Sequence, residues 1–189
     1  SFAGCEYLYR INLGNVKVIE AYAFTSCAEL GSIDLSSAET IGFGAFASTI
    51  VGGDIVADNL VSVGDYAFQN ARMTSFTAKN LKRIGVASFQ GNAKLKKFEF
   101  SNELESIGSI AFNGCKALES FYFPNGEING DNGYAKLVDG VLYTYMPSGR
   151  LQLTSVPAAK KLTSFSVLEG TYRVDMYAAN ENPSITWVI

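Results

Sequence analysis

An Ala-Phe or Ser-Phe dipeptide recurs along the first two thirds of the chain at a nearly constant interval. Its Phe residue occupies six positions, separated by 22, 22, 22, 21 and 23 residues. A period of this length is typical of solenoids, in which each repeat cannot bury its apolar face alone and stacks on the next repeat. We therefore predict a stack of coils whose core is anchored by this column. The column consists of Phe2, Phe24, Phe46, Phe68, Phe89 and Phe112.

A short alternation of apolar residues follows each Phe and predicts one strand per repeat. Phe98 and Phe100, for example, flank Glu99. Apolar residues two apart are typical of a half-buried strand, and stacked copies predict one parallel sheet of about six strands. An Ile-Gly or Val-Gly pair, such as Ile41-Gly42, precedes four of the six Phe residues. The glycine predicts a corner that needs either a positive φ or room for the adjacent coil. We expect short helical or 3₁₀ turns opposite the sheet.

Written as one line, the repeat is L-x-x-I-x-L-x-x-x-L-x-x-I-G-x-x-A-F-x-x-C. This pattern resembles the BspA-like leucine-rich repeat of bacterial and protist surface proteins, and residues 104–123 match it almost without departure. The resemblance covers about residues 1–124. It implies an α/β leucine-rich repeat solenoid that is rich in β structure and forms a right-handed superhelix.

A second resemblance concerns the segment 139–143, Asp-Gly-Val-Leu-Tyr. It is similar to a hairpin that interrupts many BspA-like arrays, so a hairpin element is expected near 134–156. In the family a polar turn, a second strand and a Pro-Ala element follow, and here residues 147–149, 151–156 and 157–158 fit them.

The sequence divides into two parts that we expect to share one domain. Residues 1–124 are the repeats, and residues 125–189 are the hairpin insertion with a degenerate last repeat or cap. The sequence begins inside a repeat, one residue before Phe2, so we expect a fragment or the ordered part of a longer chain. It contains no run of 18 apolar residues and no signal segment at its start, and no membrane span is expected.

The residue types present exclude most catalytic chemistry. The chain has no His, which excludes Ser-His-Asp and Cys-His mechanisms and most zinc sites. Cys5, Cys27 and Cys115 all stand three residues after a repeat Phe. We expect them to be reduced and buried as small packing residues, although a Cys5–Cys27 bridge is geometrically conceivable. The carboxylates are scattered, so we expect no enzyme and no cofactor.

The loop 125–133, Asn-Gly-Glu-Ile-Asn-Gly-Asp-Asn-Gly, invites comparison with a calcium loop. Its first, third, fifth and sixth residues fit an EF-hand loosely, but the twelfth position is Lys136 instead of a bidentate Glu. We interpret the segment as a solvated turn that leads out of the repeat register, and we expect no metal site.

The charge pattern contains a basic block. Residues 66–98 contain seven basic residues and no acidic residue, within a chain of net charge −3. Because adjacent coils stack closely, these residues should form a spatial patch. The patch serves either solubility or the docking of an anionic partner. Its members, our candidate ligand-binding residues, are Arg72, Lys79, Lys82, Arg83, Lys94, Lys96 and Lys97.

Aromatic residues gather in the last third of the chain. They either cover the last coil or form a recognition face, since Tyr and Trp are frequent in protein and sugar contacts. These residues are Tyr134, Tyr143, Tyr145, Tyr172, Tyr177 and Trp187.

Three functions remain open. The resemblance implies a cell-surface or secreted module that binds a protein ligand, such as a host protein or a neighbouring surface protein. The basic block favours an anionic glycan as an alternative ligand. A purely structural spacer in a long surface protein is the third alternative. Nucleic acid is not expected, because the chain is acidic overall and lacks a basic groove with stacking aromatics.

Overall fold

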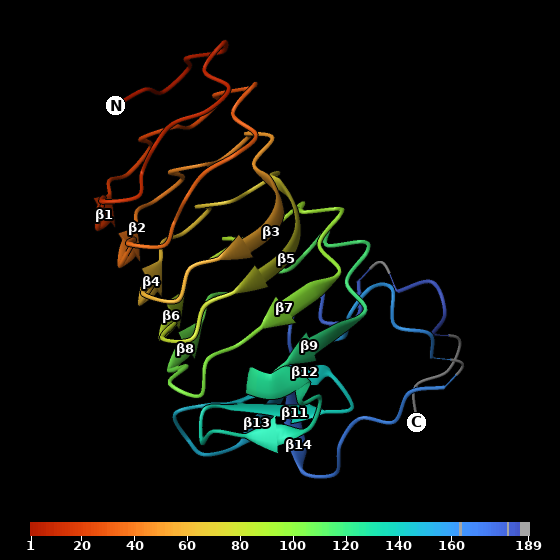
Figure 1. Ribbon diagram of the computed structural model, residues 1–189. Coiled ribbons are helices and arrows are strands. Elements are labelled where there is room, and N and C mark those ends of the chain that lie inside the picture. Colours follow the sequence, from red (N-terminus) through yellow and green to blue (C-terminus); the bar gives the residue numbers. More distant parts are fainter. Residues whose placement is uncertain (163, 181, 186–189) are drawn as a thin grey trace.

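The chain forms a stack of coils whose strands make two parallel sheets (Figure 1), in a computed structural model that describes residues 1–162, 164–180 and 182–185. A third sheet closes the lower end of the stack in this view. The first sheet contains β1 (Val18–Ile19), β2 (Thr40–Ile41), β4 (Ser62–Val63), β6 (Arg83–Ile84) and β8 (Ser106–Ile107). The second contains β3 (Gly52–Val56), β5 (Arg72–Thr77), β7 (Lys97–Glu99) and β9 (Ser120–Tyr122).

The column of six Phe residues forms a continuous stack through the core, as predicted. Ring centroids of successive members lie 5.3–5.7 Å apart and their planes differ by 5–18°. Phe46, Phe68 and Phe89 are completely buried. A second aromatic group from the strands packs edge-on against this stack, for example Phe98 against Phe112 at 4.8 Å. Several of these rings are among the largest fully buried side chains of the core.

The predicted helical turns opposite the sheet are wrong. From the turn of Phe24 onward, each turn instead contains two residues in the left-handed region. One lies two positions before the stacked Phe and the other lies two positions after it, as Tyr22 and Ser26 do with φ of 57°. The N–H groups of Tyr22, Phe24 and Ser26 donate to carbonyls of the next coil at 2.8 Å. Because these groups point along the stack, they cannot form the bonds of a helix. Among the described residues, the one helical segment is the 3₁₀ turn η1 (Pro124–Gly126).

The prediction of a single six-stranded sheet is also wrong. The flank of each coil that precedes the Phe pairs separately as the first sheet, and the alternating segment forms regular strands in four coils. In the first two coils it makes only the isolated bridge between Arg10 and Ser32. There Asn12 and Asp34 accept the N–H of the residue two positions on, at 3.0 and 2.9 Å. Such turns compete with strand pairing.

The corner glycines provide room for the adjacent coil. A Cβ atom on Gly42 would lie 2.6 Å from the backbone nitrogen of Ala21, and one on Gly64 would lie 2.8 Å from the backbone of Gly42. Neither Gly42 nor Gly64 has a positive φ. Of the two roles predicted for this position, close approach is therefore the one that the structure uses.

The slot three residues after each Phe has a hydrogen-bonding role that the sequence analysis missed. The thiols of Cys27 and Cys115 donate to the carbonyl of the Phe in the preceding coil, at 3.0 and 3.2 Å. The amide of Asn92 donates in the same way at 2.7 Å. Cys27 and Cys115 are buried, but Cys5 is exposed because it lies in the first coil, so the prediction of burial is wrong for Cys5. No disulfide joins Cys5 and Cys27.

The predicted hairpin is present and contributes two adjacent strands to the third sheet. Asp139 and Gly140, with φ of 51° and 70°, form a tight turn typical of two-residue hairpins. Leu137 and Leu142 on its strands belong to the core of the repeats. The sheet contains β10 (Gly130–Asp131), β11 (Ala135–Val138), β12 (Val141–Tyr145), β13 (Leu151–Ser155) and β14 (Thr171–Val174).

Candidate binding surface

The exposed face of the sheet β3-β5-β7-β9 is a regular surface of the solenoid. Buried residues alternate with outward-facing ones along each strand, and the register places equivalent residues side by side from coil to coil. Outward side chains therefore form two straight columns with a spacing of about 4.8 Å between strands. These side chains are Asp54, Val56, Ser75, Thr77, Lys97, Glu99, Ser120 and Tyr122.

Three of the seven predicted basic site residues are paired with carboxylates of adjacent coils. Lys79 Nζ lies 2.7 Å from Asp58 Oδ2. Lys82 lies 3.7 Å from both Glu103 and Glu105, and Arg83 lies 3.9 Å from Glu105. The acidic partners are 21–23 residues away in sequence, which is one repeat. A spacing of one repeat between opposite charges could have predicted these pairs from the sequence. A count of charges along the chain does not reveal them.

The other four basic residues lie around β5 and β7. Arg72, Lys94, Lys96 and Lys97 are all exposed. Within the described residues, no carboxylate lies at ion-pair distance from any of them. We call these four residues the basic edge. The structure thus brings together a smaller cationic surface than the sequence block indicates.

Two carboxyl groups on the sheet face are affected by their neighbours. The hydroxyls of Ser75 and Thr74 both donate to Asp54 Oδ1 at 2.7 Å. These bonds, followed by the attraction of Lys97, lower the pKa of the Asp54 carboxyl. Burial is the main reason that the pKa of the Glu99 carboxyl is raised. The sheet face is therefore mixed in charge, and Lys97 stands within the field of an anionic neighbour.

Most of the tyrosines in the last third are structural. Tyr134 Oη accepts the N–H of Ile107 at 2.8 Å, and burial raises the pKa of the Tyr134 hydroxyl. Tyr143 is buried, and Tyr145 donates to Asp131 at 2.7 Å. Tyr172 and Tyr177 are exposed. Trp187 lies outside the described residues.

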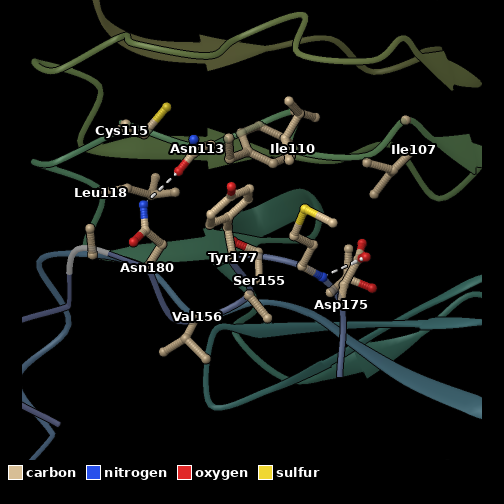
Figure 2. Close-up of a pocket in the computed structure, with 18 residues that line it drawn as sticks. Ile107, Ile110, Asn113, Cys115, Leu118, Ser155, Val156, Asp175, Tyr177 and Asn180 are labelled. Carbon is tan, nitrogen blue, oxygen red and sulfur yellow. Dashed lines mark hydrogen bonds between the residues drawn. The ribbon is translucent and has the colours of Figure 1, made fainter. Parts of the chain in front are cut away.

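A small, partly open cavity lies between the coil of Phe112 and the segment 175–180 (Figure 2). Its volume is about 30 Å³, and Leu118 is among the residues that line it. Beside it, Asn180 Nδ2 donates to Asn113 Oδ1 at 2.9 Å. The cavity can hold about two water molecules but is far smaller than the roughly 300–1,000 Å³ of ligand pockets.

The loop 125–133 behaves as a turn. Asn132 Nδ2 donates to the carbonyls of Asn102 and Leu104, at 3.1 and 3.0 Å, and so fastens the loop to the preceding coil. Within residues 1–162, 164–180 and 182–185, no cluster of three His, Cys, Asp or Glu side chains could hold a metal ion. The same part of the chain has no helix with the length and apolar character needed to cross a membrane.

The sequence matches the family described as BspA type leucine rich repeat region, in six copies that extend over residues 1–75 and 19–132. No curated protein matches the chain in sequence.

Several solved bacterial structures share the fold. A leucine-rich repeat protein from Eubacterium ventriosum superposes with a TM-score of 0.77 at 21% identity, over 95% of this chain and 49% of that one. A leucine rich cell surface protein from Faecalibacterium prausnitzii gives 0.63 at 18% identity, over 95% and 60%. The pneumococcal vaccine antigen PcpA gives 0.58 at 21% identity, over 92% and 50%. The chain thus spans about half of the length of these proteins.

Proposed function

Because the chain belongs to the BspA-type leucine-rich repeat family, we propose that it is a non-enzymatic protein-binding module, used for adhesion, of a cell-surface or secreted protein. The surface location is supported by the descriptions of two structural relatives, one as a cell surface protein and the other as a vaccine antigen. The repeats and the hairpin part share core residues, which supports one continuous domain over residues 1–124 and 125–189.

The observation that carries the proposal is the outward face of the sheet β3-β5-β7-β9. It offers hydroxyl, charged, aliphatic and aromatic side chains in fixed register, including Val56, Thr77 and Tyr122. A rigid face of mixed chemistry can bind a protein with little loss of side-chain entropy.

The test is the capture of surface proteins on the immobilised chain, compared with matched variants. We expect a captured protein to be lost in the double variant Val56→Arg and Thr77→Arg, because both side chains face outward from the sheet. The control Glu29→Arg changes the net charge by the same amount at an exposed site outside the sheets, and it should retain the captured protein. Retention of every captured protein by the double variant would contradict the proposal and would favour a structural spacer.

The basic edge supports a second candidate function, the binding of an anionic glycan. Its four cations have no carboxylate at ion-pair distance within the described residues, whereas Lys79, Lys82 and Arg83 do. An unpaired cation does not have to give up a partner to bind a polyanion. Of the seven candidate residues predicted from the sequence, we therefore propose that the four of the basic edge contribute most to binding. They are Arg72, Lys94, Lys96 and Lys97.

Heparin affinity as a function of salt tests this second function. We expect retention to decrease steeply with salt, because the screening length falls to about 8 Å at physiological ionic strength. The variant Lys94→Glu, Lys96→Glu, Lys97→Glu should abolish binding, and Lys79→Glu, Lys82→Glu should weaken it less. Equal effects of the two variants would show that the distribution of ion pairs does not define the site.

A further inference from the structure

A row of aromatic rings that are partly or largely open to solvent runs along the turns that carry the stacked Phe residues. Tyr22, Phe43 and Tyr66 come from three successive coils, and their ring centroids are 5.1 and 5.3 Å apart. Adjacent planes are tilted by 52° and 51°. Tyr22 and Phe43 are 51% and 40% exposed, and Tyr66 is half-buried. We call these three residues the aromatic row.

The aromatic row differs from the core stack in a way that matters for binding. Rings of the core stack are within 18° of parallel, so each face is covered by the next ring. Rings of the row are inclined and partly open to solvent, so part of each face remains available to a ligand. Each of three successive coils contributes one ring, from the second residue before the stacked Phe in the coils of Tyr22 and Tyr66 and from the third residue before it in the coil of Phe43.

Folding does not require tyrosine at these positions. Tyr22 and Tyr66 both have a φ of 57°, a left-handed conformation that is unfavourable for residues other than glycine. The equivalent residue in the coil between them is Gly44, which has the same φ of 57°. A large ring that is at least partly open to solvent, and held at a position where glycine is less strained, points to a role outside the core.

The turns that carry the row contain few charges, although the exposed Glu20 stands two residues before Tyr22. The five turns that span residues 21–26, 43–48, 65–70, 86–91 and 109–114 contain one charged residue, Asp65. Its carboxylate accepts the N–H of Val86 at 2.8 Å. Amides and hydroxyls occupy the outward positions instead, and Gln69 donates to Gln90 at 2.6 Å. Each of these amides keeps further donor and acceptor capacity.

We propose that the aromatic row binds an extended, uncharged glycan chain. The C–H face of a pyranose ring packs on the electron-rich face of an aromatic ring, and its hydroxyls can bond to the amides and hydroxyls of the turns. A linear polymer of sugar rings matches a linear array of aromatic rings. This ligand differs from the anionic glycan of the basic edge, and the site is separate from the sheet face.

The width of the row favours a single polymer chain over a folded protein. Protein interfaces of standard size bury about 800 Å² on each partner, with many contacts in two dimensions. The row is one ring wide and advances only from Tyr22 to Tyr66 along the stack. A ligand that follows the stack axis can contact every ring, whereas a globular partner would need contacts beyond the row.

The experiment measures binding of defined neutral hexasaccharides, namely cellohexaose, xylohexaose, mannohexaose, laminarihexaose and chitohexaose, with a heparin hexasaccharide as the charged comparison. We expect at least one neutral probe to bind with an affinity that does not change with salt. The double variant Tyr22→Gly and Tyr66→Gly should lose about tenfold or more of that affinity. Its unfolding midpoint should stay within about 4 °C, since glycine suits the backbone there.

Two control variants separate this site from other surfaces. Tyr172→Ser removes an exposed ring elsewhere and should leave neutral glycan affinity unchanged. Lys94→Glu with Lys97→Glu should weaken heparin binding alone. The proposal is overturned if no neutral probe binds, if the glycine variant binds as well as the native chain, or if that variant loses a protein ligand without any glycan binding. None of these outcomes decides whether the sheet face binds protein.

Discussion

The contribution of each stacked Phe should depend on how many coils cover it. Phe46 is completely buried between Phe24 and Phe68, and both neighbouring ring centroids lie 5.3 Å away. Phe2 contacts one ring of the stack and is 47% exposed. We expect Phe46→Ala to lower the free energy of unfolding by about 3–5 kcal/mol and Phe2→Ala to lower it much less. Denaturant unfolding checks this, and equal losses would contradict the stack.

The sequence pattern predicts the stacking of these Phe residues but not the hydrogen-bonding role of the cysteine slot. The Phe column could be predicted because a large apolar residue at a fixed period has few uses other than stacking. The cysteine slot was interpreted as a packing site only. Cys27 and Asn92 both carry a hydrogen-bond donor, and a pattern of apolar residues does not reveal this shared property. The bond to the preceding Phe carbonyl becomes visible only when two coils are placed together.

At the scale of the elements, the corner glycine limits how closely two coils can stack. A Cβ on Gly64 would meet backbone atoms of the preceding coil at 2.8 and 2.9 Å, and backbone cannot move aside as a flexible side chain can. We expect Gly64→Ala to cost about 1–3 kcal/mol or more through overpacking. Equilibrium unfolding in urea measures this cost.

Gly31→Ala is the matched control for this prediction. Its Cβ would meet the side chain of Ile50 at 3.7 Å and the carbonyl oxygen of Glu29 at 3.9 Å, both ordinary contact distances. We expect a neutral or slightly stabilising effect of about 0.4–1 kcal/mol, because alanine restricts the unfolded chain. If the two variants lose the same stability, close approach of the coils is not the reason for glycine at the corner.

The turns could not be predicted from local pattern. An Ala-Phe pair beside a glycine suits both a short helix and an irregular turn, and the choice depends on where the backbone N–H groups find acceptors. In this fold they find them in the next coil, as Phe24 does at the carbonyl of Ala45. Likewise, Asn12 and Asp34 disturb strand pairing through local hydrogen bonds, which a strand pattern of apolar residues does not reveal.

At the scale of the whole molecule, charges that are distant in sequence become neighbours. The pairing of Lys79 with Asp58 and of Lys82 with Glu105 follows from the coil register. These pairs are exposed and should contribute little to stability, but they reduce the cationic surface from seven residues to the four of the basic edge. A count of charges along the chain predicted the location of the patch and overestimated its extent.

The stack should be least protected at the boundary between the repeats and the last coil. In the middle of the stack, the N–H groups of Tyr66, Phe68 and Asn70 donate to the next coil at 2.8 Å. In the coil of Phe112, the equivalent N–H groups of residues 110, 112 and 114 have no such acceptor within the described residues, and the cavity of Figure 2 lies beside them.

Hydrogen exchange measures this difference directly. We expect the amides of Ile110, Phe112 and Gly114 to exchange faster than those of Tyr66, Phe68 and Asn70, because exchange requires an unbonded N–H and is limited by local opening. The amide of Phe121 is the internal control, since it follows in the same repeat but donates to the carbonyl of Gly140 at 3.1 Å. It should exchange slowly. Equal protection of the amides on both sides of the boundary would show that the last coil continues the stack without a break. Fast exchange at residue 121 as well would show that the whole coil opens, and not only its turn.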